Sequence, residues 1–237
     1  MMQWWTPDAV RFMRDASEYG AHYTLLSEYL MRWLPADGHV CDAGCGLGYL
    51  AQALAAHCRC VTAIDRSEAA IAAALARDLP GNLRFYCDDV FAMHPDPLYD
   101  AMTFCYFGRT EEILCAAKRQ CSGVAVMVKR DCSERRFSVS QTRTHRDVRA
   151  SAEELLRSLK IPFEISHLAL ELGQPFRSMG DAVRFFSLYN EGKEIGESWV
   201  ASRLQETGRA DFPLYLPETR NMAIIALEAK AIPEEFA

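Results

Sequence analysis

Residues 40–54 read VCDAGCGLGYLAQAL and join a short apolar run to a helical pattern. The run ends at Asp42, and Gly44, Gly46 and Gly48 follow at alternate positions. Glycine is costly at the start of a helix, but it permits positive φ and lets a ligand approach the backbone closely. Open α/β sheets bind ligands where a strand turns into a helix. The stretch therefore predicts a ligand site at this bend.

Strand and helix patterns alternate on both sides of the bend. The predicted strands are 39–43, 60–65, 83–87, 99–107 and 123–129, and the predicted helices are about 20–34, 47–57, 68–79 and 110–119. Ser67 is a plausible N-cap for the third of these helices. Because the strands are almost continuously apolar, the pattern favours a parallel sheet that is covered on both faces.

The pattern changes after Arg130. A capping box formed by Ser151 and Glu154 predicts the start of a helix, and strands are expected at 163–172 and 220–229. Between these two strands the pattern predicts helices at 178–190 and 198–206. Residues 173–212 are therefore expected to form a cap segment inserted between two strands.

Composition limits the classes of protein that fit. The chain has 237 residues and a formal net charge of −6, so its overall field does not favour an anionic partner. No apolar run is long enough to span a membrane and no targeting segment is recognised, which predicts a cytoplasmic protein without a membrane partner. The nine cysteines include no C-x-x-C pair, which favours reduced thiols and predicts no metal site.

Acidic residues close the strands that follow the bend. Asp65 ends the second strand, where a carboxylate can accept hydrogen bonds from two ribose hydroxyls, and Asp88 and Asp89 follow the third strand, near where an adenine amino group would lie. The third glycine comes one position too early for a dinucleotide fingerprint, and Asp42 would repel a phosphate. A ligand with a cationic amino group tolerates Asp42.

The ordered set VCDAGCGLG, AIDRS and YCDDV resembles the class I S-adenosylmethionine-dependent methyltransferase superfamily over about residues 20–130. The resemblance implies a Rossmann-like three-layer α/β sandwich with a seven-stranded, mostly parallel sheet whose last strand is antiparallel. It implies one methyltransferase domain over 1–237. Within it we expect an N-terminal helical lid at 1–35, a cofactor-binding half at 36–130 and the cap segment at 173–212.

The same resemblance implies S-adenosylmethionine as cofactor, S-adenosylhomocysteine as product, and a set of binding positions. The cofactor positions carried over are Asp42, Ala43, Gly44, Cys45, Gly46, Asp65, Arg66, Asp88, Asp89, Val90, Cys105 and Tyr106. The acceptor positions are Trp4, Trp5, Tyr19, Tyr23, Phe107 and Arg109. No general base is identified, and His94 and His145 are the candidates to test.

The acceptor class is the open question. FCYFGR, at the end of the fourth strand, lacks the Asn/Asp-Pro-Pro-aromatic tetrad, which disfavours methylation of exocyclic amino groups in DNA or of protein glutamine. The aromatic N-terminus and the cap favour a secluded small-molecule acceptor in a monomer or homodimer. Residues 129–149 hold seven Lys or Arg against three acids, which keeps an RNA or protein methyltransferase as an alternative. A non-catalytic nucleotide-binding protein or an oxidoreductase is the remaining alternative for the function.

Overall fold

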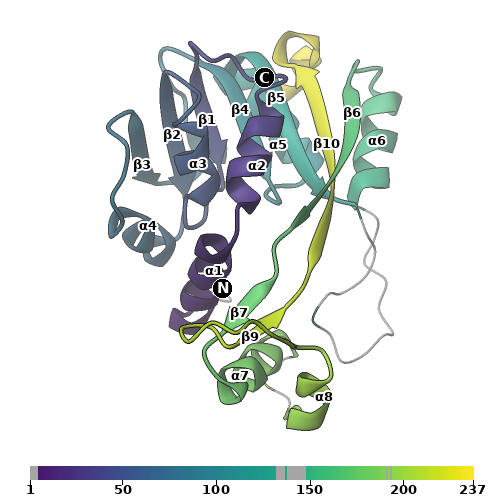
Figure 1. Ribbon diagram of the computed structural model, residues 1–237. Helices are drawn as coiled ribbons and strands as arrows, with labels where there is room; N and C mark the ends of the chain where they lie inside the picture. The colour runs from purple at the N-terminus through teal and green to yellow at the C-terminus, as the bar shows by residue number, and fades with distance from the viewer. Residues whose placement is uncertain (1–4, 132–136, 138–147, 191, 193) are drawn as a thin grey trace.

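A seven-stranded sheet forms the centre of the chain (Figure 1). The computed structural model describes residues 5–131, 137, 148–190, 192 and 194–237. The strand order is β3-β2-β1-β4-β5-β10-β6. The strands are β1 His39–Ala43, β2 Cys60–Asp65, β3 Leu83–Cys87, β4 Tyr99–Cys105, β5 Cys121–Arg130, β6 Glu164–Glu171 and β10 Thr219–Glu228.

Only β10 runs against its neighbours in this sheet. It pairs antiparallel with β5 and β6, whereas β1, β2, β3, β4 and β5 pair in parallel. This confirms the predicted Rossmann-like fold class, including the antiparallel last strand.

Helices cover both faces of the sheet, which gives the three layers. Leu26, Leu30, Leu50 and Leu54 pack on one face, and Ile113, Leu114 and Leu156 pack on the other. The first group comes from α2 His22–Leu30 and α3 Tyr49–Leu54, and the second from α5 Thr110–Gln120 and α6 Val148–Ser158. The β2–β3 connection carries α4 Glu68–Leu75, which the Ser67 hydroxyl caps by accepting from Ala70 N, as predicted.

A second, smaller layer lies beyond one end of the sheet (Figure 1). We call residues 174–216, from β7 to β9, the cap. It holds a three-stranded sheet in the order β7-β9-β8 and two helices. Its elements are β7 Gln174–Phe176, α7 Met179–Tyr189, α8 Glu197–Ala201, β8 Gln205–Glu206 and β9 Leu214–Leu216. In Figure 1, β6 and β10 run from the main sheet down to the cap.

Helix α1, Pro7–Tyr19, packs with the cap instead of the main sheet. Phe12 is 1% exposed and lies edge-on to Phe176 and Phe185, with ring centroids 6.2 and 5.1 Å away. Two arginine–carboxylate pairs flank this contact: Arg11 donates to both Asp181 oxygens, and Arg177 donates to both Asp15 oxygens. The helix is therefore fixed to the cap by both apolar and charged contacts.

Several element boundaries differ from the sequence predictions, and two of these differences lie in the second half of the chain. Helix α6 begins at Val148, so Ser151 lies inside the helix and the predicted capping box there is wrong. The helix expected at 198–206 ends at Ala201, because Gln205 and Glu206 pair with β9.

Candidate functional site

The predicted bend is formed by residues 44–48, which we call the glycine bend. Gly44, Gly46 and Gly48 have φ values of +71°, +54° and +73°, a region that side chains strongly disfavour. A Cβ at Gly44 would lie 2.0 Å from the Phe107 ring, and one at Gly46 would lie 2.9 Å from Cζ2 of Trp5. The glycines therefore permit both the backbone path and a close aromatic approach.

Hydrogen bonds from β2 hold the glycine bend in place. The Ile64 carbonyl accepts from Gly44 N at 2.8 Å and from Cys45 N at 3.0 Å. One oxygen of Asp65 accepts from Gly46 N at 2.9 Å, and the other accepts from Ser67 N at 2.9 Å. The bend and the acid that closes β2 therefore form one unit. Since each carboxylate oxygen has two lone pairs, Asp65 retains capacity for ribose hydroxyls.

Asp42 is a buried carboxylate with an unsatisfied oxygen. Its side chain is 1% exposed, and Oδ1 accepts from the Thr103 hydroxyl at 2.9 Å. Oδ2 has no hydrogen-bond partner among the described residues. Burial raises the pKa of Asp42 to about 7, the Asp65 charge adds to the rise, and the Thr103 hydrogen bond opposes it. A cation beside Oδ2 would satisfy this oxygen.

The remaining cofactor positions lie after β2, β3 and β4. Asp89 accepts from Phe91 N at 3.0 Å, and Arg66 lies 3.5 Å from it. Asp88 accepts from Asp89 N, and Val90 is buried. After β4, Tyr106 has φ +54° and leads into Phe107, whose ring stacks on Phe91 at 5.2 Å. The carboxyl ends of four neighbouring strands thus bring together every carried-over cofactor position.

The predicted acceptor positions separate into different environments. Trp5 and Phe107 contact the glycine bend, whereas Tyr23 stacks on Tyr49 and packs against the same core cluster as Cys45 and Cys105. Tyr19 instead stacks on Tyr215 at 4.9 Å, and Arg109 pairs with Glu112 at the exposed start of α5. Trp4 and His145 lie outside the described residues, as does most of 129–149, and His94 is exposed.

Sequence reasoning missed Lys129 and Arg220. Lys129 is 3% exposed and donates to the Gly108 carbonyl at 3.0 Å, and burial lowers the pKa of Lys129 to about 8. This hydrogen bond fixes Gly108 in the loop after β4 to β5. Lys129 lies near the end of β5 and Arg220 near the start of β10, where a charged residue is common in any strand. Only the pairing of β5 with β10 brings them to the same end of the sheet, so the local sequence gives no signal for either residue.

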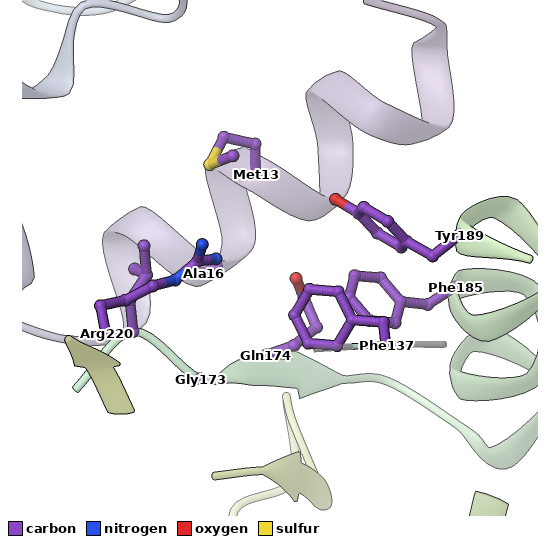
Figure 2. A pocket seen from close by; sticks show the side chains of 9 residues that line it. Met13, Ala16, Phe137, Gly173, Gln174, Phe185, Tyr189 and Arg220 are labelled. Atoms are coloured by element: carbon purple, nitrogen blue, oxygen red, sulfur yellow. The ribbon is translucent and has the colours of Figure 1, made fainter. Parts of the chain in front are cut away.

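A small pocket borders α1, the cap and the start of β10 (Figure 2). Its walls include Met13, Phe137, Gln174, Phe185, Tyr189 and Arg220. It lies where the cap meets the end of the sheet that carries the cofactor positions, because Arg220 is on β10 and two aromatic walls, Phe185 and Tyr189, are on α7.

Comparisons with known proteins agree with this geometry. Residues 40–126 match a family described as methyltransferase domain. The matched segment contains the glycine bend, Asp65 and the acids after β3, and it lies in a sheet of the expected order. Over this segment the chain is similar to a methyltransferase domain.

Solved structures share the fold of this chain at low sequence identity. Precorrin 8w decarboxylase from Methanobacterium thermoautotrophicum is 19% identical over 86% of this chain and 88% of its own, with a TM-score of 0.52. A proposed type II methyltransferase from Anaeromyxobacter dehalogenans is 20% identical over 88% and 97%, with a TM-score of 0.53.

The [4+2]-cyclase SpnF is 18% identical over 86% of this chain and 80% of its own, with a TM-score of 0.51. A search of curated proteins returns no match. The likenesses show the fold, and a fold hosts more than one chemistry.

The residues around the glycine bend fit S-adenosylmethionine, the cofactor that the matched methyltransferase family implies. The unsatisfied Oδ2 of Asp42 suits the amino group of the methionine tail, and Asp65 suits the ribose. The glycine bend supplies a surface without Cβ atoms. Among the described residues, no helix is long and apolar enough to cross a membrane.

Proposed function

We propose that the chain is a methyltransferase that transfers a methyl group from S-adenosylmethionine to a small-molecule acceptor held beneath the cap. One observation carries the choice of acceptor: α1 and the cap are joined across the sheet edge by the Phe12 contacts and by two arginine–carboxylate pairs. A pocket lined by both of them suits a small ligand better than a polymer.

The chain's contribution to this reaction is mainly positioning. The bound cofactor supplies an electrophilic methyl group on a sulfonium. Asp65 and Asp42 would hold the sugar and the amino group, and the loop after β4 would place Cys105 and Tyr106 beside the reacting end. Alignment of two reactants is worth about 7–11 kcal/mol, so a site without an identified base can still accelerate transfer to a good nucleophile.

The buried groups near the reacting end are held neutral. Burial raises the pKa of Tyr23 and of Cys105, and the Asp42 charge adds to the rise in both. Neither is therefore a base at neutral pH. The proton of an acceptor hydroxyl would have to leave by another group or to water, which favours an acceptor that is nucleophilic without strong base assistance.

An RNA or protein acceptor is the second candidate, and its support is the basic composition of residues 129–149. Of the described part of that stretch, Lys129 is buried and Arg149 pairs with Asp131 and Glu153. These two basic residues are therefore engaged within the protein.

Two measurements test the proposal. First, thermal shift with S-adenosylmethionine, S-adenosylhomocysteine, NAD and NADP should show stabilisation by the first two ligands. Stabilisation by the dinucleotides alone would contradict it. Second, the protein is incubated with methyl-labelled cofactor and separate RNA, protein and low-mass fractions of one cell extract. We expect label in the low-mass fraction, and label confined to RNA or protein would refute a small-molecule acceptor.

A further inference from the structure

Arg220 is placed where a methyl acceptor would meet the cofactor site. It is the second residue of β10, pairs with Leu170 on β6, and reaches into the pocket beside Ala16 (Figure 2). On β10, Met222 and Ile224 follow Arg220 at alternate positions and pack against the α2 and α3 face of the sheet. Arg220 therefore projects from the same face, toward the helices that border the cofactor site.

The charge of Arg220 affects residues near the cofactor site and residues of the cap. It opposes the rise in pKa that burial causes at Tyr23 and Cys105, beside the cofactor site, and at Tyr189, in the cap. The guanidinium therefore lines the pocket and is also within electrostatic range of Tyr23 on α2 and Cys105 on β4.

Arg220 differs from the other arginines near this junction. Arg11 and Arg177 are neutralised by Asp181 and Asp15. Within the described part of the chain, no carboxylate lies within ion-pair distance of Arg220, and its Nε is buried without a hydrogen-bond partner. A buried donor without an acceptor is costly, so a ligand that accepts from it gains affinity.

The pocket around Arg220 is otherwise mostly apolar. Met13, Phe185 and Tyr189 form its walls, and Gln174 uses its amide nitrogen on the Phe12 and Pro175 carbonyls. The free volume is about 10 Å³, close to what one water molecule needs. A ligand with a flat apolar body would enter by separating the aromatic walls.

We propose that Arg220 binds the carboxylate of the methyl acceptor, and that the acceptor is a carboxylic acid with an aromatic or similarly flat apolar body. This inference rests on the proposed function. The planar guanidinium matches a carboxylate in two parallel hydrogen bonds. A single arginine suits one negative charge better than a phosphate dianion, since Asp42 and Asp65 lie on the other side of the same site.

The test measures binding by calorimetry with S-adenosylhomocysteine present at saturation. The probes are benzoate, phenylacetate and 3-phenylpropanoate, each against its primary amide. We expect the best acid to bind wild type at least about 10-fold more tightly than its amide, the scale of a charge-assisted hydrogen bond. Arg220→Gln should remove the preference, and Arg220→Lys should keep part of it. Arg184→Gln, an exposed arginine on α7, is the matched control and should change nothing.

Each failure has a distinct signature. If wild type does not bind S-adenosylhomocysteine, the proposed function is refuted. If it does bind but acids and amides bind alike, or if Arg220→Gln leaves the preference intact, the inference is overturned while the proposed function stands. If none of the acids binds wild type at 20 mM (a ceiling of about −2.3 kcal/mol), the inference is also overturned.

Arg220 could instead hold the carboxylate of the cofactor's own tail. Decarboxylated S-adenosylhomocysteine separates the two cases. We expect Arg220→Gln to bind intact and decarboxylated cofactor products with the same ratio of affinities as wild type. A loss confined to the intact product would assign Arg220 to the cofactor and overturn the inference. A thermal midpoint of Arg220→Gln near that of wild type excludes misfolding as the cause.

Discussion

The glycine bend and the cap are built in different ways. At the bend, the backbone determines the site: positive φ values at Gly44 and Gly46 and hydrogen bonds to Ile64 and Asp65 fix its shape. In the cap, side chains from distant parts of the chain determine it. Arg11 meets Asp181, Arg177 meets Asp15, and Phe12 meets Phe185.

The difference implies that the two regions tolerate substitution to different degrees. A backbone site tolerates few substitutions, because almost any side chain collides with it. A site assembled from side chains can change specificity one residue at a time, provided that its core contacts remain. Substitutions in the glycine bend and in the cap test this difference.

Gly44→Ala should give the largest effect. The substitution puts a Cβ at φ +71° and 2.0 Å from the Phe107 ring, so we expect a loss of about 2–5 kcal/mol in unfolding free energy from strain and overpacking. Urea denaturation measures it. The Gly44→Ala/Phe107→Ala double variant relieves the collision but keeps the strain. Gly81→Ala, where a Cβ meets nothing within 4 Å, is the matched control. Equal stability of both glycine variants would show that the backbone does not determine the site.

Asp42→Asn should stabilise the protein more at pH 7 than at pH 5. Burial raises the pKa of Asp42 to about 7, so between pH 4 and 7 the folded state keeps a proton that the unfolded state has lost. The wild type therefore loses stability as pH rises through this range, and the neutral variant does not. We expect the difference between the two to grow by about 2–3 kcal/mol from pH 5 to 7. A constant difference across denaturation curves at pH 5, 6 and 7 would contradict the buried charge.

Asp65→Ala should weaken binding of S-adenosylhomocysteine by about 1.5–3 kcal/mol, the scale of hydrogen bonds to a charged group. The variant also removes the acceptor for Gly46 N and Ser67 N, so its melting temperature is measured alongside the dissociation constant. Asp78→Ala, an exposed acid after α4, is the control. An unchanged dissociation constant for Asp65→Ala would reject the ribose role.

The Asp15–Arg177 pair should show a coupling of about 1–3 kcal/mol in a double-mutant cycle, because the two residues touch and Asp15 is 4% exposed. The exposed Arg209–Asp211 pair in the β8–β9 turn is the matched control and should couple far less. Thermal unfolding of Asp15→Asn, Arg177→Gln and the double variant measures the term. Similar coupling in both pairs would show that the charged contacts of the cap are generic surface pairs.

The sequence predicts the cofactor half well because each element there is signalled locally. Alternate glycines after a short apolar run, an acid that closes the next strand and Ser67 before a helix need no distant partner. The cap residues carry no such signal. Arg220 lines the pocket only because β10 pairs with β6 and α7 packs nearby, and both contacts join distant parts of the sequence. Ser151 shows the opposite case: it carries the local signal of a capping box, but it lies inside α6, which begins at Val148.

The cap leaves the main sheet after Glu171 and returns at Thr219, and these two residues face each other across one antiparallel pair. An insertion whose two ends are neighbours can be exchanged for another without reconnecting the strands around it. Because α1 is bonded to this insertion by Arg11 and Asp15, a working chimera must carry both segments from the same donor. Lineages that vary their acceptors by recombination would therefore inherit the first helix and the insertion as a pair.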